Sequence, residues 1–220
     1  MKAMILCAGR GERMRPLSDK IPKPLIKIHS KPLIVWHIEK LAYLGFSEIV
    51  INIAHLGDKI LSFLGDGSKW GVSLLYSDER NSGALESAGG IIKALPLLGN
   101  DTFLVVNGDI WCDYEFESDF DLVNDLAHLI LVPNPQHNPL GDFGLEKNRA
   151  LNSAEIKYTF SGIGYYSPEL FNTLKEEKLP LAPILRQAID NNRVSVSLYD
   201  GKWHDIGTPQ RLQAAEATSE

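Results

Sequence analysis

The sequence predicts an α/β domain in which helices cover both faces of a mostly parallel central sheet. Three observations support this prediction. Short apolar runs bounded by turn residues recur along the 220 residues, and helical patterns lie between the early runs. The composition, with 44% hydrophobic and 23% charged residues, is that of an ordinary globular domain. In such a fold, ligands bind at the carboxyl ends of the strands.

Strands are expected where the short runs are apolar, β-branched or aromatic. The first run, residues 4–7, has the pattern of a buried strand and ends directly in a glycine-containing segment. The other expected strands cover residues 48–53, 72–76, 102–107, 129–132, 160–165 and 194–198.

Helices are expected at three places. Residues 32–44 place apolar side chains near helical spacing, and Gly45 ends the pattern as a C-terminal glycine does. A second helix is expected over residues 58–64, and the Ala- and Glu-rich residues 210–220 predict a terminal helix. Residues 133–152 are rich in Pro, Asn and Gly, so we expect a loop or hairpin there that overhangs a site.

Charge and cysteine content exclude several classes of protein. The 22 Lys and Arg residues against 28 Asp and Glu residues give a net charge of −6, which repels a nucleic-acid backbone. Cys7 and Cys112 are the only cysteines, and both lie in apolar context, so we expect free thiols in a reducing compartment. The apolar residues before Gly9 are too few for a signal-peptide core or a spanning helix. We therefore expect a cytoplasmic protein with no nucleic-acid or membrane partner.

A segment rich in glycine and arginine follows the first expected strand. Glycine lets backbone N–H groups approach anionic oxygens, and guanidinium groups make bidentate contacts with them, so the segment can hold a polyphosphate. A solvated surface turn explains the segment alone about equally well. A dinucleotide-binding loop would need glycine where Met14 stands, and no Gly-Lys-Ser/Thr triplet follows as in a Walker-type loop.

A lysine and an aspartate further along could complete an anion site. Lys23 lies between Pro22 and Pro24, which stiffen the backbone and keep the segment out of a helix. Asp109 follows the apolar run of the expected strand at residues 102–107, where α/β folds bind ligands. Closing a turn is the alternative role for this aspartate. The six histidines are scattered without the spacing of zinc ligands, so we expect no zinc site.

Three motifs, in this order, resemble those of a known enzyme family. They are Gly-x-Gly-x-Arg-Met-x-Pro-Leu at residues 9–17, Pro-Lys-Pro-Leu at residues 22–25 and Trp-x-Asp-x-Gly-Thr-Pro at residues 203–209. Together with Asp109 they resemble the sugar-1-phosphate nucleotidylyltransferases, which join a nucleoside triphosphate to a sugar 1-phosphate and release pyrophosphate. The resemblance implies one Rossmann-like, three-layer αβα domain over residues 1–220, with a mostly parallel, mixed central sheet. No hexapeptide repeat follows Pro209, so no C-terminal β-helix is expected.

The resemblance also implies a role for each site residue. Arg13 and Lys23 would be catalytic and would contact the nucleotide: Arg13 at the leaving pyrophosphate, Lys23 beside the α-phosphate and the sugar phosphate. Asp109 and Asp205 would hold Mg²⁺, an ion that takes one or two carboxylates together with phosphate oxygens. The other implied nucleotide contacts are Ala8, Gly9, Gly11, Glu12, Glu86, Gly89 and Gly90. The implied sugar contacts are Asn107, Asp142, Gly144 and Ser161.

Within the family, the motifs are most similar to a compact subgroup that acts in bacterial cell-wall recycling. This similarity implies UTP and N-acetyl-α-muramate 1-phosphate as substrates, UDP-N-acetylmuramate as product, and a monomer or small homo-oligomer. Glu86 and Ser87 depart from the commonest nucleotide motif, so a mannose- or glucose-1-phosphate enzyme using GTP or dTTP is the alternative. A non-catalytic nucleotide-sugar sensor is a further alternative, although binding alone has no use for a complete metal pair.

Overall fold

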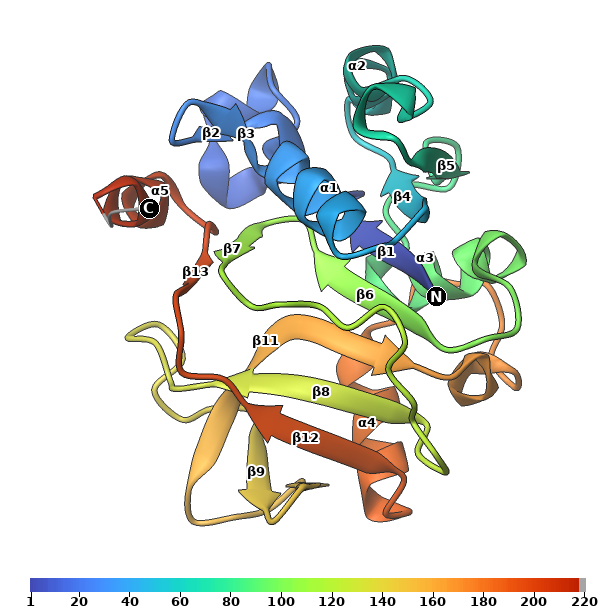
Figure 1. Cartoon of the computed structure of the whole chain (residues 1–220). Coiled ribbons are helices and arrows are strands. Elements are labelled where there is room, and N and C mark those ends of the chain that lie inside the picture. The colour runs from blue at the N-terminus through green and yellow to red at the C-terminus, as the bar shows by residue number, and fades with distance from the viewer. Residues whose placement is uncertain (218–220) are drawn as a thin grey trace.

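A nine-stranded mixed sheet organises the computed structural model, which describes residues 1–217 (Figure 1). The strands of this sheet are β1 (Lys2–Leu6), β4 (Glu48–Ile53), β5 (Ser73–Asp78), β6 (Phe103–Asn107), β8 (Ala127–Val132), β9 (Phe143–Glu146), β10 (Arg149–Leu151), β11 (Lys157–Tyr166) and β12 (Val194–Leu198). Their order across the sheet is β5-β4-β1-β6-β11-β8-β12-β10-β9.

Helices and two small strand pairs complete the described fold. The helices are α1 (Leu33–Tyr43), α2 (Gly57–Leu64), α3 (Glu86–Leu98), α4 (Leu181–Asp190) and α5 (Pro209–Glu216). The small pairs are β2 (Lys27–Ile28) with β3 (Lys31–Pro32), and β7 (Ile110–Cys112) with β13 (Trp203–Asp205). None of the helices within residues 1–217 is long and apolar enough to cross a membrane.

Strand directions are mixed, as the sequence predicts. β5, β4, β1 and β6 run parallel, β12 runs parallel with β8, and β11 lies antiparallel between β6 and β8. β9 pairs with both β10 and β11, so β8 to β12 close into a ring of five strands. The α/β class and the mixed sheet are thus confirmed. The Rossmann-like description is wrong for the ring, because a Rossmann sheet is open.

The ring closes because β11 is long and bent. Its later residues, Ile163 to Tyr166, pair with β6 and β8, whereas Lys157 and Tyr158 at its start pair with β9. The register shifts between Phe160 and Ile163, where Gly162 has a φ of 81°. A bulge of this kind bends the strand and increases its twist, which lets one strand join two neighbours.

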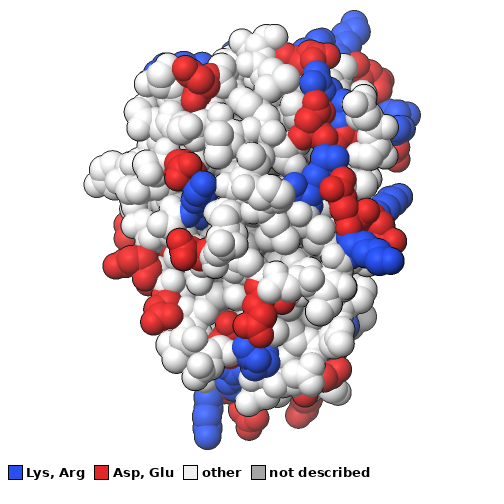
Figure 2. All heavy atoms as spheres, turned by 90° about the vertical axis from the view of Figure 1, so that its right-hand side faces the viewer, with Lys and Arg blue, Asp and Glu red and all other residues white. Residues whose placement is uncertain are grey.

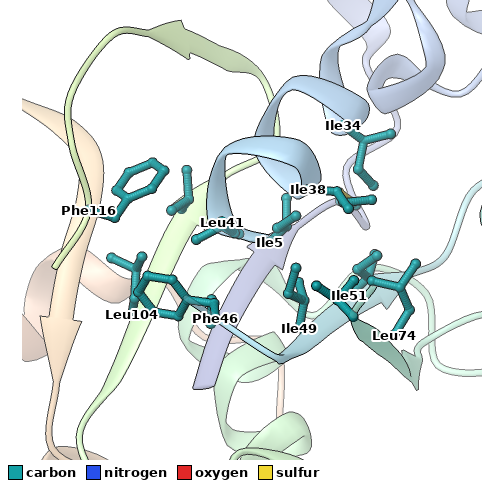
Figure 3. Close-up of a cluster of buried hydrophobic side chains, with 14 of the residues drawn as sticks. Ile5, Ile34, Ile38, Leu41, Phe46, Ile49, Ile51, Leu74, Leu104 and Phe116 are labelled. Atoms are coloured by element: carbon teal, nitrogen blue, oxygen red, sulfur yellow. The ribbon is translucent and has the colours of Figure 1, made fainter. Parts of the chain in front are cut away.

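Apolar side chains on both faces of the sheet pack against helices. Along β1, Ala3 and Ile5 point to one face and Met4 to the other, as the period of two in a strand requires. The first face carries α1 and α2, and Figure 3 shows Ile34, Ile38 and Leu41 of α1 directed at the side chains of the sheet. The second face carries α3 and α4. The parallel end of the sheet therefore has helix, sheet and helix layers, as predicted.

Most predicted elements are present, and the structure adds two helices and several short strands to them. The segment at residues 133–152 forms a hairpin from β9 and β10, one of the two expected alternatives. Gly45 ends α1 with a φ of 93°, in the left-handed region that favours glycine. The terminal helix covers Pro209–Glu216, and residues 218–220 of that prediction lie outside the described chain. The helices α3 and α4 and the short strands β2, β3, β7 and β13 are not among the elements expected above.

Positive and negative side chains are interspersed on the face that Figure 2 shows. Some of the charged side chains of the described residues form ion pairs, such as Arg80 with Asp58 and Asp78 near the edge strand β5. Such mixing leaves the net charge of −6 without one dominant acidic patch on this face.

Candidate active site

A cavity of about 680 Å³ lies at the carboxyl ends of β1, β4 and β6. Leu6 and Asn107, the last residues of β1 and β6, are register partners, and the Gly108 amide donates to the Leu6 carbonyl at 3.0 Å. The loops after the two strands therefore leave the sheet side by side. Residues that line the cavity include Cys7, Ala8, Gly9, Arg10, Glu12, Lys23, Asn52, Glu86, Ser87, Asn107, Asp109 and Lys178.

The loop after β1 takes its shape from internal contacts at Gly11. The Gly11 carbonyl accepts from the Met14 amide at 2.8 Å and from the Ser18 hydroxyl at 2.7 Å. Gly11 has a φ of 63°, and a Cβ atom there would lie 3.3 Å from the Cβ atoms of Lys23 and Ser18. Because a larger residue would be strained and crowded, glycine here lets the loop pack against Lys23.

Lys23 and Asp109, which both line the cavity, form an ion pair. The Lys23 Nζ donates to Asp109 Oδ2 at 2.6 Å, and only 11% of the lysine side chain is exposed. A 3-10 turn at Lys23–Leu25, with Pro24 buried, holds the lysine backbone. An ammonium group in this position can neutralise a phosphate that binds at the ends of β1 and β6.

Asp205 lies beside Asp109, although 96 positions separate them in the sequence. Asp205 is the register partner of Ile110 in the β7–β13 pair, and the Ile206 amide donates to the Asp109 carbonyl at 2.8 Å. Asp205 Oδ2 contacts Arg211 Nη1 at 2.6 Å and His137 Nε2 at 3.3 Å. The short β7–β13 pair thus brings the backbone of Asp205 beside that of Asp109.

Arg13 reaches the same place from the loop after β1. A Cβ atom at Gly207 would lie 2.9 Å from Asp205 Oδ1 and 3.4 Å from a terminal nitrogen of Arg13. Arg13 and Asp205 therefore flank Gly207. The structure thus places Lys23 against Asp109 and Arg13 near Asp205, and the roles of these four residues stay predictions.

The acids fit a divalent cation of the hard, oxygen-binding kind. Asp205 Oδ1 is buried and has no hydrogen-bond partner, so one carboxylate oxygen is left over for a ligand. Within residues 1–217, no group of three or more His, Cys, Asp and Glu side chains could hold a metal ion. The two carboxylates of Asp109 and Asp205 suit Mg²⁺, which binds through one or two carboxylates and completes its shell with phosphate oxygens and water.

A buried carboxylate beneath the cavity joins three of its walls. Glu79 is fully buried and accepts from Asn52 Nδ2 at 2.7 Å and from the Leu85 amide at 2.8 Å. Asn52 Oδ1 in turn accepts from the Cys7 amide at 2.7 Å. Burial raises the pKa of Glu79, while its hydrogen bonds act in the opposite direction. This network ties the loop after β1 to the start of α3.

A second cavity of about 430 Å³ continues from the first, because Glu86, Ser87 and Asn107 line both. Asp142 lies on its wall, where its Oδ2 accepts from the Phe160 amide at 2.8 Å. A phosphate chain in the first cavity and a ring in the second could therefore share one continuous space.

Comparison with known proteins identifies the family. The model of the nucleotidyl transferase family matches residues 2–220. The chain belongs to this family. It is 51% identical to the N-acetylmuramate alpha-1-phosphate uridylyltransferase of Neisseria meningitidis serogroup B, over 99% of this chain and 97% of the relative. It is 28% identical to a mannose-1-phosphate guanyltransferase of Gibberella zeae, over 96% of this chain and 62% of the relative.

A solved structure of a relative has the same fold. It is a Bacillus anthracis protein, provisionally named as a glucose-1-phosphate thymidylyltransferase, in complex with sucrose. The TM-score is 0.85 at 25% sequence identity, and the match covers 99% of this chain and 94% of the other. The α/β fold and the membership of the nucleotidyl transferase family therefore rest on sequence and structure alike.

The structure distributes the predicted site residues of this nucleotidyl transferase between the cavity walls and the framework behind them. Those on the cavity walls are Ala8, Gly9, Glu12, Lys23, Glu86, Asn107, Asp109 and Asp142. Arg13 and Asp205 meet at Gly207. The predicted contacts Gly11, Gly89, Gly90, Gly144 and Ser161 are absent from the described residues that line either cavity.

Those residues have packing contacts that explain their small size. A Cβ atom at Gly89 would lie 2.1 Å from the Glu177 carbonyl oxygen, and one at Gly90 would lie 2.8 Å from Glu79 Oε1. One at Gly144 would lie 2.4 Å from Ala154 Cβ. Ser161 is 1% exposed and donates to the Ile130 carbonyl at 2.7 Å.

Sequence reasoning missed Asn52, Glu79 and Arg186. Asn52 and Glu79 lie at the ends of strands that were predicted, and a polar residue at such a position was the available signal. Arg186 lies on α4, which the sequence did not predict, so no signal placed it near the site.

Proposed function

We propose that the protein transfers a uridylyl group from UTP to N-acetyl-α-muramate 1-phosphate, forming UDP-N-acetylmuramate and pyrophosphate. One observation carries the proposal: the Lys23–Asp109 pair lies at the carboxyl ends of β1 and β6, and Arg13 and Asp205 flank Gly207, just after the strand that pairs with the segment following Asp109. The substrates are those in the name of the relative that is 51% identical over nearly the full length of both chains.

The reaction needs alignment and charge neutralisation more than a covalent intermediate. An oxygen of the sugar phosphate attacks the α-phosphorus of UTP, a new P–O bond forms, and the bond to the β-phosphate breaks. Lys23 would lie at the α-phosphate and the sugar phosphate, since it points into the first cavity beside Asp109. Arg13 would stabilise the negative charge that develops on pyrophosphate, because a guanidinium group offers a planar fork of hydrogen-bond donors.

We also propose that the reaction depends on magnesium held by Asp109 and Asp205. When bound, the ion would supply positive charge to the phosphate oxygens that these side chains approach. The unpartnered Asp205 Oδ1 supports this assignment. Lys23 keeps Asp109 in place, and Arg211 and His137 keep Asp205 in place, so the chain holds both carboxylates ready.

The remaining assignments depend on the proposed substrates. We propose that the whole chain is one nucleotidyltransferase domain, that it works in the cytoplasm, where UTP is available, and that it serves cell-wall recycling as a monomer or small homo-oligomer. Relatives named for mannose 1-phosphate or glucose 1-phosphate share the phosphate chemistry, but their names give a different sugar. The identity of the sugar therefore needs its own test.

The test is a matrix of four nucleoside triphosphates against N-acetylmuramate, mannose and glucose 1-phosphates, with pyrophosphate release as the readout. We expect the highest kcat/KM for UTP with N-acetylmuramate 1-phosphate, and loss of turnover when EDTA removes the magnesium. A higher value for another pair would overturn the substrate assignment. Absence of pyrophosphate release with every pair would favour the nucleotide-sugar sensor.

A further inference from the structure

We propose that Arg186 binds the lactyl carboxylate of N-acetylmuramate 1-phosphate and so sets the sugar specificity. This inference rests on the proposed function, since only that sugar among the candidates carries a carboxylate. It names the group on this chain that distinguishes muramate from neutral sugars.

Arg186 occupies the far wall of the second cavity. That cavity is lined by Glu86, Ser87, Asn107, Asp142, Phe143, Phe160, Pro180, Leu181, Ala182, Leu185 and Arg186, and Arg186 is the only cation among these described residues. The cavity joins the first one through the shared residues Glu86, Ser87 and Asn107. A sugar whose 1-phosphate lies near Lys23 would extend through this shared part toward Arg186.

Arg186 differs from most arginines of the chain in having no carboxylate partner. Five arginines form ion pairs: Arg15 with Asp19, Arg80 with Asp58 and Asp78, Arg149 with Asp125, Arg193 with Glu169 and Arg211 with Asp205. Within residues 1–217, the arginines without such a partner are Arg10, Arg13 and Arg186. Arg10 lines the first cavity and Arg13 reaches Gly207, so all three lie at the proposed substrate site.

The guanidinium group is held in place by groups that leave its charge available. Its central carbon lies 5.0 Å from the centre of the Phe143 ring, and its Nη1 lies 3.4 Å from Asn152 Oδ1. Asn152 also donates to the Arg186 carbonyl at 2.8 Å, which fixes the helix backbone at this point. Leu185, the neighbouring residue of α4, is buried in the apolar cluster on the face of the sheet that carries α3 and α4. Arg186 is exposed, and its contact with Phe143, which also lines the second cavity, keeps the guanidinium group at this cavity.

The other charges of the cavity place the carboxylate at this end. Asp142 Oδ2 accepts from the Phe160 amide, and Glu86 lies 3.6 Å from Lys178. These acids would repel a second carboxylate but can accept hydrogen bonds from hydroxyl and amide groups of a sugar. Among the described residues that line the second cavity, Arg186 alone offers the bidentate, charge-assisted pairing that a carboxylate favours.

The test measures KM for N-acetylmuramate 1-phosphate and for UTP in Arg186→Met, Arg186→Lys and Arg186→Glu. We expect Arg186→Met to raise the KM of the sugar phosphate about 10- to 100-fold, the usual effect of losing a hydrogen bond to a charged group, with the KM of UTP unchanged. Arg186→Glu is expected to raise it further through repulsion. Arg186→Lys is expected to recover part of the loss, because one ammonium cannot reproduce the planar fork.

A matched substrate separates recognition of the carboxylate from a structural role. The same sugar phosphate with its lactyl acid converted to an amide should bind wild type more weakly, and Arg186→Met should change its KM little. Lys175→Met, which removes an exposed positive charge away from both cavities, is the control and should match wild type. The assignment of Arg186 would be overturned if Arg186→Met raised the KM of the acid and of the amide equally, or if it raised the KM of UTP.

The outcomes also distinguish this proposal from the one on which it rests. If wild type turns over N-acetylmuramate 1-phosphate and Arg186→Met keeps its KM, only the role of Arg186 is wrong. If wild type does not turn over this sugar phosphate, the proposed function is wrong, and the role of Arg186 fails with it.

Discussion

At the scale of single residues, the two acids of the site have unequal surroundings but the same expected importance. Asp109 faces Lys23, whereas Asp205 carries a buried, unpartnered oxygen. We predict that Asp109→Asn and Asp205→Asn each lower kcat about 100-fold or more, because each removes charge where the transition state needs it. Pyrophosphate release measures this, and circular dichroism checks the fold. Asp200→Asn, an exposed change outside both cavities, should keep wild-type turnover.

Glu79 is predicted to position the nucleotide without touching the phosphates. Glu79→Gln replaces one acceptor oxygen by a donor that faces either Asn52 Nδ2 or the Leu85 amide. We expect a higher KM for UTP and a stability loss of about 1–3 kcal/mol, the cost of an unsatisfied buried group. Titration with UTP and urea unfolding measure the two effects. An unchanged KM for UTP would show that the network has only a structural role.

We predict that titration of His128 makes the free energy of unfolding depend on pH. Burial lowers its pKa to about 4, and its ring nitrogens lie 2.9 Å from the hydroxyls of Ser195 and Ser197. The unfolded chain binds the proton near pH 6.5 and the folded chain only near 4, so stability falls as pH drops through this window. The contribution is about 2 kcal/mol at most between pH 7 and pH 5.

Unfolding in urea at the two pH values tests this contribution in wild type and in His128→Gln. The variant should lose less stability than wild type on going from pH 7 to pH 5, because it lacks the titrating ring. Buried His37, whose pKa is also lowered to about 4, keeps part of the dependence in both proteins. Equal losses in wild type and variant would contradict the assignment to His128.

At the scale of elements, the bulge in β11 connects the sheet to the sugar side of the site. Gly162 has a φ of 81°, and a Cβ atom there would lie 2.4 Å from Asn107 Nδ2. We predict that Gly162→Ala lowers the free energy of unfolding by about 1–3 kcal/mol, through backbone strain and crowding, and raises the KM of the sugar phosphate. Gly71→Ala is a control for the strain alone, since its φ is 72° and no atom lies within 4 Å of the added Cβ. Equal KM values in the two variants would contradict a role for Asn107.

The elements that sequence reasoning found are those whose pattern is complete within one segment. β1, β4 and β6 are continuous apolar runs, and each was predicted. α4 was missed because Pro180 and Pro183 interrupt its start, although proline is tolerated in the first turn of a helix. β7 and β13 are three residues each, and their pairing depends on contacts 91 to 95 positions apart in the sequence, such as Trp203 with Cys112 and Asp205 with Ile110.

At the scale of the whole molecule, the sequence predicts those site residues that lie in recognisable motifs. It does not predict those that only the tertiary structure brings to the site. Arg13, Lys23, Asp109 and Asp205 follow from recognisable motifs, and the structure brings them together. The closed ring of β8 to β12 and the position of Arg186 depend on how distant strands pair, which no local pattern encodes. The second cavity, where we propose that the sugar binds, therefore became visible only in the fold.

Because the site joins segments from both ends of the chain, nucleotide binding should stabilise the whole fold. UTP at 100 times its Kd, with magnesium, should add about 2.7 kcal/mol, which corresponds to a rise in Tm of about 5–10 °C for a chain of this size. Thermal unfolding with and without UTP measures the shift. Arg13→Met, at an exposed position outside the described core, should keep the Tm of the free protein and lose most of the shift. A full shift in this variant would place the triphosphate away from Arg13, and the cations that line the first cavity, Arg10, Lys23 and Lys178, would then have to neutralise the leaving group.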